Sequence, residues 1–203
     1  MIKKRLKKHR MKNTPSLKDS ALLIIDMQYF FCKPGSHAYI KDAPHIIRKI
    51  QVLLNVYREE HLPVIYTRHA LLRSESPGAM GRWWRDTLYD DEERSAIDDR
   101  IKPLPGEIVI RKTRYSAFYD TDLEKILKNS NINSLVITGV LTHLCCESTA
   151  RDAFIRDYNV FLVIDATASD DKKLYNASLL TLSDGFAKLV KTNEVIEWLR
   201  IKK

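Results

Sequence analysis

The sequence lacks any long apolar segment, and this absence limits where the protein can work. No stretch of the 203-residue chain approaches the roughly 18 apolar residues that a membrane-spanning helix needs, so we expect no membrane contact. A secretory signal is not expected either, because the basic start of the chain is not followed by a long apolar region. Internal repeats and interdomain linkers are missing too. With 44% hydrophobic residues, the chain can form one globular domain with an ample core.

Cysteine is scarce, and acidic residues are absent from the start of the chain. The three cysteines are too few for a disulfide scaffold and favour a reducing, cytoplasmic location. Residues 1–12 contain seven basic side chains and no acidic one. Taking these seven from the 34 basic side chains of the chain leaves 27, against 26 acidic ones. The net charge of +8 therefore comes almost entirely from this segment.

We expect residues 1–15 to form a solvated basic arm and residues 16–203 to form the single domain. Binding of the arm to nucleic acid or to an anionic surface is the alternative, which we do not favour. Retention on heparin or DNA would then depend on residues 1–12. Translation starting at Met11 would remove most of the arm.

Strand and helix patterns alternate along the chain. Such alternation is typical of an α/β fold, here a doubly wound, mostly parallel six-stranded sheet with helices on both faces. Predicted strands span residues 21–26, 63–67, 107–111, 134–139, 159–165 and 187–191. Predicted helices span residues 43–60, 120–130, 144–158, 172–184 and 193–201.

Cys145 follows a predicted strand-to-helix turn. Ser134 to Gly139 has the pattern of a buried strand, and Leu144 to Tyr158 that of a helix with Thr142 as its N-cap. A thiol at this turn meets free N–H groups and the positive end of the helix dipole, which lower its pKa and can hold an oxyanion. One turn can thus supply a nucleophile and an oxyanion hole. An ordinary buried thiol is the alternative.

Helical geometry separates Cys145 from its neighbour Cys146. At about 100° per residue, Cys146 shares a face with the apolar side chains of Ala150, Ala153 and Phe154. Cys145 shares a face with the polar side chains of Thr149, Asp152 and Arg156. We therefore expect Cys146 in the core and Cys145 facing a polar site.

Two charged residues also follow predicted strands. Asp26 ends the apolar run of residues 21–25, and Lys112 follows the strand-like residues 108–111. Charged residues often close strands, so each one alone says little. Parallel strands, however, bring their carboxyl ends to one edge of the sheet, where open α/β sheets bind ligands. Asp26, Lys112 and Cys145 are therefore expected at the same edge.

Three segments in this order resemble the isochorismatase-like cysteine hydrolases, whose members include nicotinamidases and N-carbamoylsarcosine amidases. The first is Ile25-Asp26-Met27-Gln28, and the second is Lys112-Thr113-Arg114-Tyr115-Ser116-Ala117-Phe118. The third is Gly139-Val140-Leu141-Thr142-His143-Leu144-Cys145, continued by Thr149-Ala150-Arg151-Asp152-Ala153. The resemblance covers about residues 17–200 and implies the same doubly wound fold.

The resemblance implies a catalytic triad of Asp26, Lys112 and Cys145. Asp26 would take the thiol proton and pass it to the departing amine, while Lys112 would orient the other two and stabilise charge. Cys145 would form an acyl-enzyme that water hydrolyses. A cis peptide bond between Val140 and Leu141 is also implied. It would turn the Leu141 N–H toward the oxyanion that the Cys145 N–H binds.

Two departures from family patterns limit which reactions and substrates we expect. Isochorismatases proper cleave a vinyl ether and carry glycine at the position of Cys145, so the thiol favours hydrolysis of a carbon–nitrogen bond. Nicotinamidases bind a metal through an Asp-x-His pair after the second strand. Here the sequence is Thr67-Arg68-His69-Ala70, so we predict no metal and no cofactor. His69 is then a polar pocket residue or a structural one, and nicotinamide is a weaker candidate substrate.

Residues 74–91 form a long stretch without clear periodicity that carries adjacent tryptophans, Trp83 and Trp84. We interpret it as a lid or pocket wall, with a hydrophobic cluster or a subunit interface as the alternative. Arg82 and Arg85 could receive a substrate carboxylate. The other candidate pocket residues are Gln28, Phe30, Tyr115, Phe118 and His143.

We expect a cysteine hydrolase that acts on a small amide or carbamoyl compound and forms a dimer or tetramer of identical chains. Hydrolysis of an isochorismate-type ether is one alternative. A non-catalytic binding or assembly protein on the same fold is another.

Overall fold

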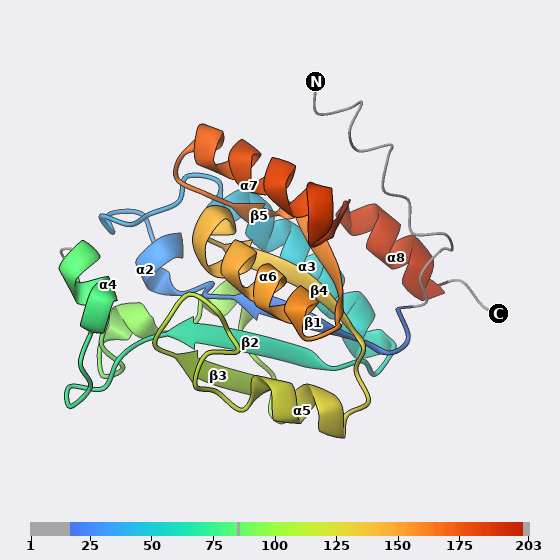
Figure 1. Ribbon diagram of the computed structural model, residues 1–203, viewed down its shortest axis with the longest axis horizontal. Helices are drawn as coiled ribbons and strands as arrows, with labels where there is room; N and C mark the ends of the chain where they lie inside the picture. Colours follow the sequence, from blue (N-terminus) through green and yellow to red (C-terminus); the bar gives the residue numbers. More distant parts are fainter. Residues whose placement is uncertain (1–16, 85, 201–203) are drawn as a thin grey trace.

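Six parallel strands form one central sheet in the order β3-β2-β1-β4-β5-β6 (Figure 1). The computed structural model describes residues 17–84 and 86–200, so the predicted arm of residues 1–15 and Arg85 lie outside the described residues. The strands are β1 (Ser20–Ile25), β2 (Val64–His69), β3 (Ile108–Lys112), β4 (Ser134–Val140), β5 (Asn159–Ala168) and β6 (Lys188–Val190). The predicted doubly wound six-stranded sheet is confirmed.

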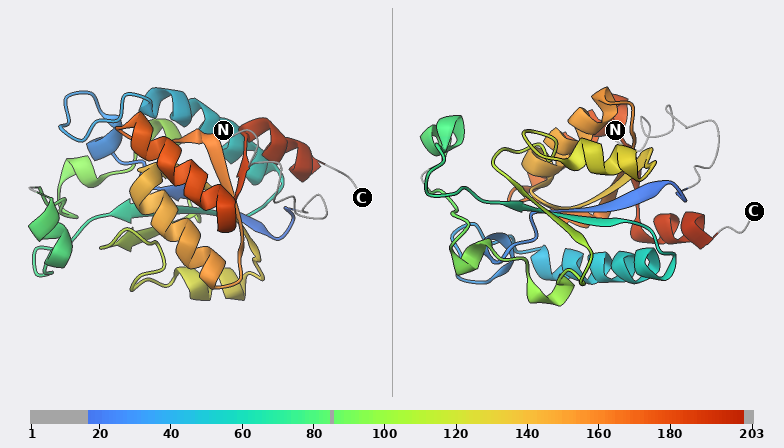
Figure 2. Two further views of the ribbon diagram at one scale, coloured as in Figure 1. Left: turned by 45° about the horizontal axis from the view of Figure 1, so that its top comes forward. Right: turned by 90° about the horizontal axis from the view of Figure 1, so that it is seen from below.

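Helices cover both faces of the sheet (Figure 2). One face carries α3 (Ala43–Glu59) and α8 (Thr192–Arg200), and the other carries α5 (Leu123–Asn129), α6 (Glu147–Ile155) and α7 (Lys172–Gly185). Every residue of β1 is buried, because its side chains alternate between two cores. Leu22 and Ile24 join the core under α3, while Leu23 and Ile25 join the core under α6.

The strand order reverses between β1 and β4, which are neighbours in the sheet. At such a reversal the loops that follow the two strands leave toward opposite faces, and a crevice opens at the carboxyl ends. Asp26 follows β1 and the turn with Cys145 follows β4. The sheet therefore places both residues beside its ligand-binding edge.

The turn after β4 differs from the predicted helix start. Helical residues begin at Thr142 rather than Leu144, in a π-helical turn, η3 (Thr142–Cys146), that leads into α6. The N-cap is Leu141, without a side-chain cap hydrogen bond, and the buried Thr142 hydroxyl has no hydrogen-bond partner. The prediction of Thr142 as the N-cap was therefore wrong. Cys145 lies inside the helical turn, further from the helix end than expected.

Four short helical segments lack a sequence prediction. They are α2 (Tyr29–Cys32), α4 (Gly78–Trp83), η1 (Glu93–Ser95) and η2 (Asp99–Ile101). The helix α4 stands out from the body of the molecule (Figure 1) and has no buried residue. It lies within the predicted irregular stretch of residues 74–91. Among the described residues, no helix is long and apolar enough to cross a bilayer.

Candidate active site

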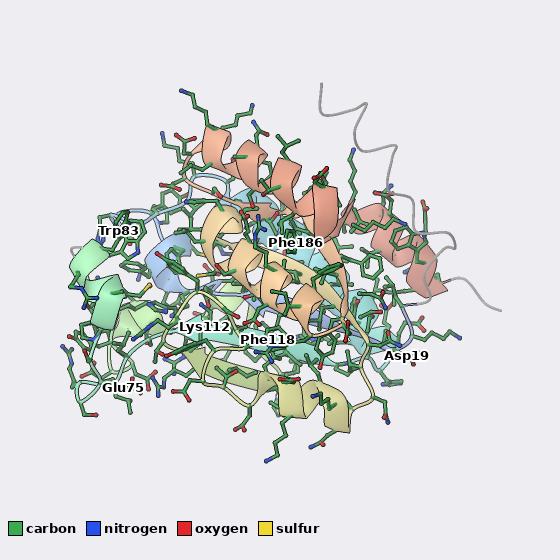
Figure 3. The ribbon with its side chains drawn as sticks, in the orientation of Figure 1. Asp19, Glu75, Trp83, Lys112, Phe118 and Phe186 are labelled. Carbon is green, nitrogen blue, oxygen red and sulfur yellow. The ribbon has the colours of Figure 1, made fainter. Side chains whose placement is uncertain are left out.

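Asp26, Lys112 and Cys145 meet at the carboxyl edge of the sheet. Lys112 Nζ lies 2.7 Å from Asp26 Oδ2 and 3.4 Å from Cys145 Sγ. All three side chains are buried. Asp26 Oδ2 accepts no well-directed hydrogen bond, so it has a lone pair available for a proton. The Lys112 ammonium group thus contacts both a carboxylate and a thiol, at the end of the sheet that faces α4 (Figure 3).

Two further groups fix this cluster, and sequence patterns did not reveal them. The Thr67 hydroxyl, on β2, donates a 2.6 Å hydrogen bond to Asp26 Oδ1. The Arg114 carbonyl accepts a 3.0 Å hydrogen bond from Lys112 Nζ. A buried ion pair is stable only when its remaining polar atoms are also satisfied, so Thr67 and the Arg114 backbone hold the pair in place. Thr67 could have been found only by noting that β2 lies between β1 and β3.

The segment after β3 is attached to α6 on the Cys145 face. Thr149 accepts a 3.0 Å hydrogen bond from the Ala117 N–H, and Ser116 donates a 2.6 Å hydrogen bond to Asp152. Both α6 residues lie on the face that helical geometry assigned to Cys145. These contacts fix the lysine-bearing segment relative to the cysteine-bearing helix.

Burial controls the protonation of the thiol. The pKa of Cys145 is raised to about 12: burial is the main cause, the charge of Lys112 opposes it, and the neighbouring Asp26 adds to it. The helix end was expected to lower this pKa; Lys112 does lower it, but the removal of water from the thiolate outweighs the lysine charge. The resting thiol keeps its proton. Attack on a carbonyl then requires transfer of that proton to a base, and Asp26 is adjacent.

Cys146 lies in the core, as helical geometry predicts. Cys146, Ala150 and Ala153 are fully buried. Phe154 was assigned to the same face but is 48% exposed, which corrects that assignment. Its ring packs at 5.6 Å against Phe186 at the end of α7, on the side of α6 rather than under the sheet.

The peptide bond between Val140 and Leu141 is cis, as the resemblance implies.

Gln28 is fully buried, and its side-chain amide forms hydrogen bonds with backbone groups. It donates to the His69 and Ser95 carbonyls and accepts from the His69 N–H. The geometry therefore gives Gln28 a supporting position rather than a free amide.

The other candidate pocket residues make contacts with different parts of the fold. Phe30 packs against Phe31 and His37, and the Arg94 guanidinium lies over its ring. Phe118 is buried against Tyr158. The His143 Nδ1 lies 2.9 Å from the Ser169 hydroxyl. A surface hollow beside α2, lined in part by Tyr29, His37 and Arg94, contains none of the three cluster residues.

The two tryptophans differ in their contacts. Trp84 donates a 2.7 Å hydrogen bond to the Tyr115 hydroxyl, in the segment that follows Lys112. Trp83 lies on α4 at the outer edge of the molecule (Figure 3) and is 79% exposed. Trp84 is thus connected to the wall of the site through Tyr115, and Trp83 is not.

His69 belongs to the site although sequence analysis left its role open. It ends β2, opposite Lys112 in the sheet register, and its Nδ1 atom is buried without a hydrogen-bond partner. Burial, with the positive charges of Lys112 and Arg114, lowers the pKa of His69 to about 4. The imidazole is therefore neutral at pH 7. No group of three metal-ligating side chains occurs in the described parts of the chain.

His69 is expected to weaken the protein in acid. The unfolded chain takes up a proton at His69 near pH 6.5, whereas the folded protein does so only near pH 4. The free energy of unfolding therefore falls as pH drops through this window, by up to about 3 kcal/mol from this residue. Urea unfolding of His69→Asn at pH 7 and pH 4.5 should show a smaller fall than the parent. An equal fall in the free energy of unfolding of both proteins would contradict this prediction. His45→Asn, at an exposed histidine, is the control variant.

Comparison with known proteins identifies the family of the chain. The isochorismatase domain model matches residues 20–194. Nicotinamidase 3 of Arabidopsis thaliana is 35% identical over 185 residues, covering 88% of this chain and 88% of the relative. Enterobactin synthase component B of Escherichia coli is 35% identical over 179 residues, which are 87% of this chain but 62% of that protein. The crystal structure of a cysteine hydrolase from Pseudomonas syringae superposes with a TM-score of 0.90 at 28% identity, covering 95% of this chain and 97% of that one.

The fold and the matched domain define an isochorismatase-like hydrolase. The chain belongs to the isochorismatase family, which has nicotinamidase and amidohydrolase members.

Proposed function

We propose that this protein is a cysteine hydrolase that cleaves a carbon–nitrogen bond of a small amide or carbamoyl compound. The observation that carries the proposal is the buried contact of a carboxylate, an ammonium group and a thiol at the carboxyl edge of the sheet. The match to a nicotinamidase and to a solved cysteine hydrolase supports the same class of reaction.

The mechanism follows from the charges of the cluster. Cys145 Sγ attacks the substrate carbonyl carbon, and its proton moves to the free lone pair of Asp26 Oδ2. The Leu141 and Cys145 N–H groups stabilise the oxyanion. Asp26 then gives the proton to the leaving nitrogen, which departs as ammonia or an amine, and a thioester remains. Water hydrolyses the thioester and restores the thiol, while Lys112 balances the charge of Asp26 throughout.

The first experiment measures ammonia release from a panel of small amides, ureido acids and alkylureas, and hydroxylamine release from hydroxamates, with Cys145→Ala beside the parent. We expect release from some members by the parent and none above background by the variant. Turnover that survives in Cys145→Ala would favour chemistry without a thiol, such as ether hydrolysis. Inactivity of the parent across the panel, with Cys145 no more reactive than Cys146 toward iodoacetamide, would favour a binding or assembly protein.

A further inference from the structure

Arg114 is the one partly buried arginine of the described residues without a carboxylate partner. Its guanidinium donates a hydrogen bond only to the Thr113 carbonyl, at 2.8 Å, and lies near the Tyr119 ring. The other partly buried arginines all form ion pairs with carboxylates: Arg58, Arg68, Arg94, Arg111 and Arg151. A partly desolvated guanidinium that is in contact with no carboxylate is costly, so this place favours binding of an external anion.

The position of Arg114 connects this charge to the active site. Arg114 lies two residues after Lys112, and its carbonyl binds the lysine ammonium group at 3.0 Å. Its charge also acts on His69, which pairs with Lys112 across the sheet. The guanidinium packs under the first residue of α4, because a Cβ placed on Gly78 would come within 2.7 Å of Arg114 Nη2. Arg114 therefore lies between the lysine-bearing segment and the α4 segment.

The charges around the site leave Arg114 unbalanced. Asp26 and Lys112 neutralise each other at 2.7 Å, and Cys145 and His69 are uncharged at neutral pH. Nearby, Glu75 is paired with Arg111 at 2.7 Å, and its carboxylate also acts electrostatically on Arg114 at longer range, so two arginines share one carboxylate. The remaining charge is the +1 of Arg114. A neutral amide would leave this charge uncompensated, whereas a substrate with a carboxylate would neutralise it through a charge-assisted hydrogen bond.

We propose that Arg114 is a specificity-determining residue that binds a carboxylate of the substrate, so that the protein acts on ureido acids or amic acids rather than on neutral amides. His69, with its unpartnered ring nitrogen, offers a second polar contact in the same part of the site. This inference rests on the proposed thiol hydrolase function and names its substrate class.

The test uses two pairs of alkylating agents that differ only in charge. Iodoacetylglycine and iodoacetyl-β-alanine carry a carboxylate, and their carboxamides are neutral. In each reaction Cys145 Sγ bonds to the methylene carbon, iodide leaves and the thiol proton is released. Modification of Cys145 is followed by peptide mass analysis. We expect the acid-to-amide rate ratio to be higher at Cys145 than at N-acetylcysteine, and to fall at least about tenfold in Arg114→Gln, because a hydrogen bond to a charged group is lost.

Three other variants complete the design. Arg114→Lys, which keeps the charge but not the planar fork, should retain an intermediate ratio. Arg48→Gln removes an exposed charge from α3 and should leave the ratio unchanged. Arg82→Gln tests the rival arginine on α4. The proposal would be overturned if the acid-to-amide rate ratio of the parent were no higher than that of N-acetylcysteine, or if the ratio were unchanged in Arg114→Gln. If the ratio fell only in Arg82→Gln, the carboxylate would bind at α4 instead.

Ammonia release separates failure of this inference from failure of the proposed function. The parent is assayed with N-carbamoylglycine, N-carbamoyl-β-alanine and propylurea. We expect Arg114→Gln to lower kcat/KM for the two acids at least about tenfold, mainly through KM, and to lower the ratio of kcat/KM for the acids to that for propylurea by a similar factor. Hydrolysis of propylurea with no preference for the acids would refute the carboxylate site and keep the hydrolase. No ammonia from any compound, with Cys145 unreactive toward both pairs of agents, would refute both.

Discussion

Replacement of Cys145 by alanine is expected to lower kcat/KM for ammonia release about 10⁴-fold or more. The variant loses the proposed nucleophile, while the backbone N–H groups and the Asp26–Lys112 pair remain. With its pKa raised to about 12, the Cys145 thiol is almost entirely protonated at pH 7. The thiol alone is therefore a poor nucleophile, and its proton must move to Asp26 during attack.

This dependence of the thiol on Asp26 predicts non-additive losses. Asp26→Asn should cost nearly as much activity as Cys145→Ala, and the double variant should be no worse than Cys145→Ala alone. Cys146→Ala is the matched control. Its thiol is fully buried, 4.0 Å from the Thr138 carbonyl, so turnover should stay within about threefold of the parent. If the effects of Asp26→Asn and Cys145→Ala multiplied, the proposed proton transfer would be wrong.

Sequence patterns predicted the sheet and its long helices because these elements bury whole faces. Strand β1 is apolar at every position but its first, and β4 contains the aliphatic run Leu135-Val136-Ile137, so their places along the chain are visible without coordinates. The short helix α4 has no buried residue, and no periodic pattern marks it. The start of the helix after β4 was placed two residues late, because its first turn is π-helical and breaks the 3.6-residue period.

The sequence predicted which residues form the site, but it did not predict their protonation states. Parallel topology alone brings Asp26, Lys112 and Cys145 to one edge. The protonation of Cys145 depends on how much water the folded protein removes, and a sequence does not contain that quantity. The role of Thr67 needs the register of β1 against β2, and the missing partner of Arg114 needs every carboxylate in three dimensions. These are tertiary properties.

Gly139→Ala is expected to destabilise the protein by about 4 kcal/mol or more, which combines backbone strain with overpacking. Gly139 has a φ of +109°, a conformation that side-chain-bearing residues rarely adopt. An added Cβ would lie 2.1 Å from the Ile25 carbonyl oxygen and 2.7 Å from its nitrogen. Both atoms are backbone, and Ile25 pairs with Gly139 in the sheet. The two strands would have to separate where they position Asp26 and the Cys145 turn, so activity should fall with stability.

Two other glycines separate the causes of this loss. Gly106 has a φ of +92° but open space where an added Cβ would lie, so Gly106→Ala tests backbone strain alone and should cost about 1–2 kcal/mol. Gly185 ends α7 with neither constraint, and Gly185→Ala should stay within about 1 kcal/mol of the parent. Urea unfolding of the three variants gives the comparison. If Gly139→Ala lowered the free energy of unfolding no more than Gly106→Ala does, β1 would be able to move away at Ile25. Close contact between the two strands would then not fix the distance between the Asp26 carboxylate and the Cys145 thiol.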